Sequence, residues 1–197
     1  MTEYIPPKQN FIRKLKDHLL ERIFNPDRAS DHEQYTPQDR SRLVLQNSRI
    51  YCHKVLRVNY TTYDIQRAQD CMNPRVHSDI MTLSEPYDTM PEGSNLHPFR
   101  YARLLGVFHV DVVHIPPGSQ TTFKTMEFLW VRWFEYDYGW KAGLKRRRLH
   151  RVRFVPQGEA HAYGFLDPDD VIRGAHLIPA FAHGQTNSEH KYFYVNM

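Results

Sequence analysis

The sequence predicts an α+β fold that is mostly β, with N-terminal helices followed by a largely antiparallel sheet or a small β-barrel. Three observations predict this fold class. Apolar residues recur with a helical period only in the first 48 residues, and after that they recur mainly at every second position. Aromatic residues make up 13% of the chain, and large flat side chains pack well on a pleated surface. Several strands joined by loops are typical of an antiparallel sheet or a barrel.

Two helices are predicted near the N-terminus, and the first of them is amphipathic. The first spans 10–25, with Asn10 as its cap and Pro26 at its end. Four apolar residues form its stripe, namely Phe11, Leu15, Leu19 and Ile23. A second, shorter helix is predicted from the N-cap Thr36, which precedes a proline, to about Gln46.

Domain boundaries follow from the change of period. Residues 1–48 are expected to form a helical segment packed on the core, and residues 49–197 a β-rich domain. The predicted strands are 54–64, 80–83, 101–114, 126–136, 147–155, 171–181 and 191–195. In the strand 101–114 one face is wholly apolar, and we expect it to be core. This face consists of Ala102, Leu104, Phe108, Val110 and Val112.

Charge and composition narrow the class of protein. The net charge of +4 and the pI of about 9.0 permit a polyanionic partner without requiring one. Cys52 and Cys71 have no CxxC spacing, so we expect reduced thiols in an intracellular protein. No apolar run approaches the ~20 residues that span a bilayer, and residues 1–10 lack a signal core. We therefore expect a nuclear or cytoplasmic protein that is not secreted and does not bind membranes.

A basic segment is the main candidate for binding. Residues 144–154 read LKRRRLHRVRF, and as a strand this segment places Arg147, Arg151 and Arg153 on one face. Side chains at alternate strand positions lie about 6–7 Å apart, similar to the spacing of phosphates along one DNA strand. The alternatives are a solvated edge strand protected by charge, or a nuclear localisation signal. The candidate nucleic-acid-binding residues are Lys145, Arg146, Arg147, Arg148, His150, Arg151, Arg153, Trp140 and Tyr138.

A metal site is the second candidate. In the segment FHVDVVH, His109 and Asp111 project from one strand face, as do the first two ligands of a two-histidine, one-carboxylate iron site. A distal histidine is also required, and the candidates are His161, His176 and His183. For this alternative we take the set His109, Asp111 and His176. The other interpretation is ordinary strand histidines, because the chain has 12 histidines and short patterns recur by chance. Our leading expectation is no metal, no cofactor and no catalytic residue.

Five long strings resemble a region of the transposase-like proteins of the Plavaka type in mushroom-forming fungi. They are RIYCHKVLRVNYTTYDIQRAQDCMNPRVHSDIMTLS, YARLLGVFHVDVVH, MEFLWVRWFEYD, GFLDPDDVIRGAHLIPAFAHG and YFYVNM. The resemblance covers 11–197 and implies a transposon-derived chain without the catalytic core, which in those proteins lies upstream. Members tend to continue past a YVNM-like string, which implies a truncated or free-standing derivative here. The family supplies no catalytic residue that can be placed on this sequence.

A shorter segment, 101–134, resembles the bromo-adjacent homology domain. The matching pieces are YAR with VF, and VRWF. This resemblance implies a β-rich chromatin reader, in which aromatic residues are candidates for a cage around a methylated lysine. The candidates are Trp130, Trp133, Phe134, Tyr136 and Trp140, and the alternative for them is core packing.

The sequence therefore predicts a non-enzymatic module that binds nucleic acid or chromatin and derives from a fungal transposon protein. One alternative is a small metalloenzyme, similar to an iron-dependent oxygenase, that uses His109, Asp111 and a distal histidine. Another is a scaffold or self-associating module that exposes apolar side chains on the strand 126–136. Salt-dependent binding, stoichiometric metal and concentration-dependent size would discriminate these three hypotheses.

Overall fold

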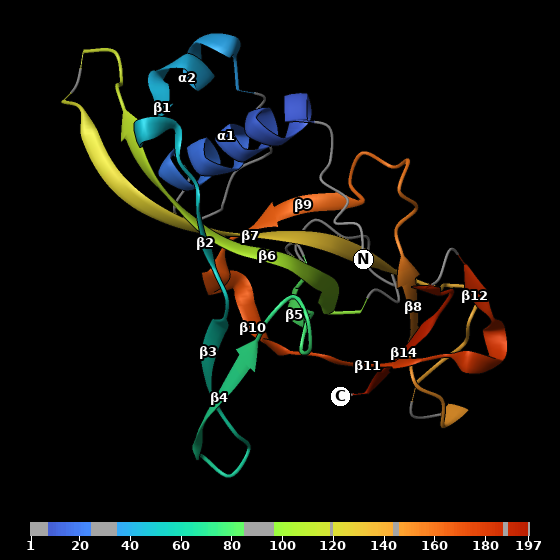
Figure 1. Ribbon diagram of the computed structural model, residues 1–197. Helices are drawn as coiled ribbons and strands as arrows, with labels where there is room; N and C mark the ends of the chain where they lie inside the picture. Colours follow the sequence, from blue (N-terminus) through green and yellow to red (C-terminus); the bar gives the residue numbers. More distant parts are fainter. Residues whose placement is uncertain are drawn as a thin grey trace, which may run out of the picture. The chain divides into compact units, whose positions relative to one another are not determined.

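The computed structural model describes most of the chain (Figure 1). The described residues are 8–24, 35–84, 97–118, 120–143, 146–186 and 189–196. Within them the fold is mostly β, with both α-helices ahead of the first strand. This confirms the predicted α+β class. Neither α-helix in this part of the chain is long and apolar enough to cross a membrane.

The elements follow one another in a simple order along the chain. The helical elements are α1 (Lys8–Phe24), α2 (Pro37–Arg42) and the 3₁₀ turns η1 (Gln46–Ser48), η4 (Pro168–Asp170) and η5 (Phe181–His183). The strands are β1 (Leu43–Leu45), β2 (Tyr51–His53), β3 (Leu56–Thr61), β4 (Arg67–Met72), β5 (Asp79–Leu83), β6 (Phe99–His114), β7 (Thr122–Tyr136), β8 (Arg151–Phe154), β9 (Tyr163–Leu166), β10 (Val171–Gly174), β11 (His176–Pro179), β12 (Gln185–Thr186), β13 (Glu189–His190) and β14 (Phe193–Asn196).

Ten of the described strands form one sheet. Seven of them lie in the order β10-β5-β6-β7-β8-β14-β11, while β1 and β2 also pair with β6, and β9 with β7. All registers defined for this sheet are antiparallel. The path ends at β10 and at β11, so the described strands do not close into a barrel. The antiparallel sheet is therefore confirmed, and the barrel alternative is wrong.

The chain divides into two compact units. The helix-bearing unit consists of residues 1–53 and 108–128, and the strand-rich unit consists of residues 54–107 and 129–197. Strands β6 and β7 are long enough to contribute residues to both units. Cys52 in the first unit and Cys71 in the second are exposed and free.

In the helix-bearing unit, α1 buries part of its predicted stripe. Leu15, Leu19 and Leu20 are completely buried, whereas Ile12 and Phe24 at the two ends of the helix are exposed. Figure 1 shows α1 (blue) beside the yellow-green ends of β6 and β7. From these strands and β1 the unit adds further buried apolar residues. They are Leu43, Val110, Val112, Met126 and Phe128.

The second helix begins as predicted and ends early. Thr36 caps it, because its hydroxyl accepts from the Asp39 amide and the Asp39 carboxylate accepts from the Thr36 amide. The helix then ends at Arg42 and not near Gln46. The reason is tertiary, because Leu43–Leu45 form β1 and pair with residues 112–114 of β6. Apolar and β-branched residues gain more from that pairing than from one further helical turn.

In the strand-rich unit, alternate residues of β6 enter two apolar clusters. The first centres on Ala102 and Leu104, and the second on Tyr101. The first cluster contains Leu56, Met72, Ile80, Ala102, Leu104, Val107, Leu129, Val131, Trp133, Val155, Ala162, Leu166 and Val171. The second contains Tyr101, Phe134, Val152, Leu177, Phe193 and Val195. The predicted core face of β6 is confirmed, except that Phe108, in the helix-bearing unit, is only half-buried.

Some strands differ from the prediction. The single strand expected over 171–181 is in fact two strands, β10 and β11, which are separated at Ala175. The amide of Ala175 donates to the carbonyl of Asp79 at 2.8 Å. The strands β1, β2, β4, β9, β12 and β13 were not predicted. The first four are short or polar and pair with longer or more apolar neighbours, whereas the two-residue strands β12 and β13 pair with each other.

Removal of core volume at β6 is expected to destabilise the fold. Leu104 is 0% exposed, and Leu83 on β5 is 63% exposed. Leu104→Ala should lower the free energy of unfolding by about 2–5 kcal/mol, because a buried cavity replaces apolar contacts. Leu83→Ala is the matched control and should change it by about 0.5 kcal/mol or less. Urea titrations of both variants check this, and equal losses would contradict the assignment of β6 to the core.

Candidate nucleic-acid interface

The basic segment is a turn followed by a short strand. The strand β8 begins at Arg151, so the predicted strand start at Arg147 is wrong. The amides of Arg146 and Arg148 both donate to the carbonyl of Gly143, and the Gly143 amide donates to the carbonyl of Arg148. Arg147 has a φ of 51°, the left-handed value that tight turns require. The predicted stripe of alternate arginines therefore does not form, and Lys145 lies outside the described residues.

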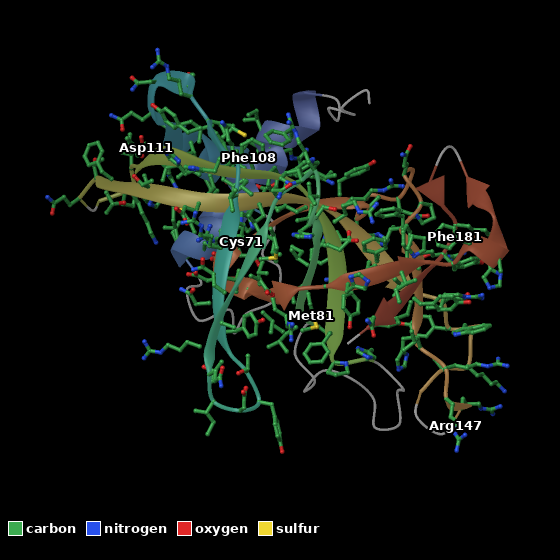
Figure 2. All side chains as sticks on the ribbon, turned by 60° about the horizontal axis from the view of Figure 1, so that its bottom comes forward. Cys71, Met81, Phe108, Asp111, Arg147 and Phe181 are labelled. Atoms are coloured by element: carbon green, nitrogen blue, oxygen red, sulfur yellow. The ribbon has the colours of Figure 1, made fainter. Side chains whose placement is uncertain are left out.

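Three arginines of this turn point into solvent. Arg146, Arg147 and Arg148 are all exposed, and Figure 2 shows Arg147 at the tip of the loop that leads into β8. Within the described part of the chain, Arg146 and Arg147 form no ion pair. The guanidinium of Arg148 lies 5.0 Å from the centre of the Trp140 ring. These three side chains can therefore reach a phosphate without first breaking an ion pair.

Arg151 has a structural role. Its Nε donates to the Asp137 carboxylate at 2.9 Å, and its side chain is only 12% exposed. The guanidinium lies between two rings, 4.3 Å from the centre of Trp140 and 4.2 Å from that of Tyr192. Its charge is compensated and its donors are occupied, so it is poorly placed to contact a polyanion.

Arg153 is also paired, although it is more exposed. Its Nε donates to Glu135 at 2.7 Å, and this hydrogen bond raises the pKa of Arg153. The register explains both pairs, because β7 and β8 place Glu135 opposite Arg153. In the sequence, Glu135 and Asp137 occupy alternate positions, and so do Arg151 and Arg153. This match of opposite charges could have predicted the two ion pairs, whereas composition alone does not reveal it.

The two candidate stacking rings differ in access. The indole of Trp140 donates to the carbonyl of Leu149 at 3.0 Å, and its ring is already in contact with Arg148 and Arg151. Tyr138 is 71% exposed. Tyr138 is therefore the ring available to stack on a base, while Trp140 mainly supports the turn.

His150 belongs to an aromatic cluster that the sequence did not reveal. Its ring meets that of His97 edge-on at 4.6 Å between centroids, and His97 stacks on Tyr136 at 5.0 Å. Tyr136 in turn donates from its hydroxyl to the carbonyl of Phe99 at 3.1 Å. Burial, with a smaller contribution from His150, lowers the pKa of His97. His97 is distant in sequence from the basic segment, and no local pattern marks it.

The metal set His109, Asp111 and His176 is not brought together. His109 and Asp111 share a face of β6 as predicted, but Asp111 accepts from the Thr125 hydroxyl at 2.6 Å. His109 instead faces His53, with 2.6 Å between His109 Nδ1 and His53 Nε2. Among the residues that the structure describes, no three His, Cys, Asp or Glu side chains are placed to hold a metal ion.

Three of the five rings that are candidates for an aromatic cage are buried and cannot surround a ligand from solvent. Trp130, Trp133 and Phe134 are buried, and Trp133 and Phe134 belong to the two apolar clusters. Trp130 packs on Phe165 with 4.7 Å between ring centroids. Core packing, the alternative for these rings, therefore describes these three residues.

Comparison of the chain with protein-family models, with curated proteins and with solved structures found no match.

Removal of the ion-paired Arg151 is expected to affect stability more than removal of the exposed Arg147. Arg151→Ala leaves the Asp137 carboxylate without its partner and removes a guanidinium packed between two rings. It should lower the free energy of unfolding by about 1–3 kcal/mol. Arg147→Ala should change it by less than about 0.5 kcal/mol. Chemical denaturation checks both values, and a neutral Arg151→Ala would contradict the structural role.

Stability is expected to fall in mild acid because of His97. Its folded-state pKa is lowered from 6.5, so below about pH 6.5 the unfolded chain binds a proton that the folded chain resists. The free energy of unfolding should therefore decrease between pH 7.5 and pH 5.5, and less so in His97→Gln. Urea titrations at the two pH values measure this. The exposed His161, as His161→Gln, is the control, and an unchanged pH dependence in His97→Gln would refute the prediction.

Proposed function

We propose that this chain is a non-enzymatic module that binds nucleic acid through the turn 146–148. The main observation behind this proposal is that three exposed arginines follow one another on a tight turn, and none of them forms an ion pair with a described residue. Guanidinium groups suit phosphate, and a turn presents them in several directions. The exposed ring of Tyr138 adds a surface on which an unpaired base can stack.

A single strand of DNA or RNA fits this arrangement best. Stacking on Tyr138 requires a base whose face is accessible, and such bases are found mainly in single strands and loops. Arg151 and Arg153 hold Asp137 and Glu135, so among the described arginines of the basic segment three remain to neutralise phosphates, namely Arg146, Arg147 and Arg148. Binding is therefore expected to be weak, sensitive to salt and largely independent of sequence.

The resemblance to transposase-like proteins of the Plavaka type supports the same proposal, because nucleic acid is the substrate of that machinery. On this view the chain derives from a fungal transposon protein and acts in the nucleus or cytoplasm, on nucleic acid or on chromatin. The scaffold alternative gains no support from β7, on which the apolar side chains from Met126 to Phe134 are buried. The metalloenzyme with the set His109, Asp111 and His176 is not supported by the geometry described above.

The test is fluorescence anisotropy with labelled single-stranded DNA, single-stranded RNA and double-stranded DNA across a range of salt. We expect single strands to bind most tightly, with a log–log salt slope of about −2 to −3, because each neutralised phosphate contributes about 0.7–0.9. The variant Arg146→Ala/Arg147→Ala/Arg148→Ala should lose most of the affinity. Tyr138→Ala should weaken single-strand binding several-fold and leave duplex binding unchanged.

A second triple variant controls for net charge. Three exposed arginines elsewhere in the strand-rich unit offer the same charge change, namely Arg57, Arg67 and Arg75. Arg57→Ala/Arg67→Ala/Arg75→Ala should retain nearly all binding. If both triple variants lose equal affinity, the turn is not the site. If the unmodified protein fails to bind at low salt, the proposed function is refuted.

A further inference from the structure

Two histidines of the helix-bearing unit face one another across neighbouring strands. His53 lies on β2 and His109 on β6, and these strands pair. The distance from His53 Nε2 to His109 Nδ1 is 2.6 Å. Tyr51 shares the strand face of His53 and stacks on His109, with 4.7 Å between centroids and 11° between planes. The pair of imidazoles is therefore positioned by two strands and a ring.

No acidic side chain among the described residues accounts for the close approach of these two imidazoles. Within the residues that the structure describes, neither imidazole forms an ion pair with a carboxylate. Asp111, which shares the face of His109, is engaged by the Thr125 hydroxyl. Cys52 lies on the opposite face of β2, because it alternates with Tyr51 and His53. The two imidazole nitrogens thus face each other at hydrogen-bond distance, and among the described residues no carboxylate is paired with either ring.

The pair is open to solvent on one side. His53 is exposed and His109 is half-buried. An ion can therefore reach the nitrogens from water, and water or an external ligand can fill positions that the protein leaves free. An arrangement of strands is suitable for such a site, because it holds ligands more rigidly than a loop does.

We propose that His53 and His109 bind one first-row transition-metal ion through His53 Nε2 and His109 Nδ1. In the metal-free pair one proton lies between the two nitrogens. When the ion binds, this proton leaves its nitrogen to solvent and a proton from solvent is taken up at the other nitrogen of the same ring, so both rings stay neutral and each donates a lone pair. At metal–nitrogen distances of about 2.0–2.1 Å, adjacent nitrogens lie about 2.9 Å apart in a square-planar copper(II) site and about 3.3 Å apart in a tetrahedral zinc site, so the rings must separate by about 0.3–0.7 Å. Rotation of the exposed His53 side chain can supply this movement.

The chemistry fixes the class of ion. Imidazole prefers copper, nickel and zinc, and for nitrogen ligands copper(II) binds most tightly of the three. Magnesium requires oxygen ligands, so it should not bind here. This site differs from the predicted set of His109, Asp111 and His176, because its second ligand is His53 and no carboxylate is required.

The experiment is a calorimetric titration of the full chain with copper(II), nickel(II), zinc(II) and magnesium in a non-coordinating buffer at pH 7.5. We expect one copper ion per chain, weaker nickel and zinc binding and no magnesium binding. His53→Ala should weaken copper binding at least tenfold, and His77→Ala, which removes another exposed histidine, should leave it unchanged. Electron paramagnetic resonance of the copper complex should show two coupled nitrogens, and one fewer in His53→Ala.

Asp111→Asn separates this proposal from a three-ligand site. It should retain the affinity of the unmodified protein, because Asp111 is engaged elsewhere. A loss in Asp111→Asn as large as that in His53→Ala would overturn the two-imidazole site. Equal copper affinities of the unmodified protein and His53→Ala would also overturn it. His53 is exposed, so its removal is not expected to unfold the chain, and the circular dichroism spectrum of His53→Ala checks this.

Discussion

The pairing of β6 with β7 is the constraint on which the other strands depend. These two strands are 16 and 15 residues long, and five further strands pair directly with one or the other. The alternation along β6 decides which side chains enter which apolar cluster, so a slip by one residue would put Arg103 and Leu105 in place of Ala102 and Leu104 in the first cluster. Strands as short as β1 and β2 form because this ladder offers them hydrogen-bonding partners.

Sequence reasoning works well where the signal is local. Neighbouring residues determine the helix cap at Thr36, the apolar face of β6 and the order of helices and strands. It fails where a distant partner decides. Leu43 could continue a helix or begin a strand, and only its partner His114 settles the choice. The polar strand β4 likewise exists because β3 lies beside it.

The candidate site shows the same contrast between features that local sequence predicts and features that a distant partner decides. Composition finds the basic segment, but it cannot tell which arginines are free. That depends on the register between β7 and β8, which brings Glu135 against Arg153, and on the turn that lifts Arg147 away. Within one segment the same residue type thus stabilises the sheet at Arg151 and faces solvent at Arg147. His97 and His53 were missed for the same reason, because each meets its partner histidine across more than 50 residues of sequence.

The position of β14 has a consequence for the order of folding. It lies between β8 and β11 in the sheet, yet it follows both of them in the sequence. During synthesis the edges of β8 and β11 that pair with β14 therefore stay unpaired until residues 193–196 have left the ribosome. Unpaired edges invite pairing with other chains. The nascent chain is thus most prone to aggregate between the synthesis of β8 and that of β14, while the edges of β8 and β11 lack their partner strand.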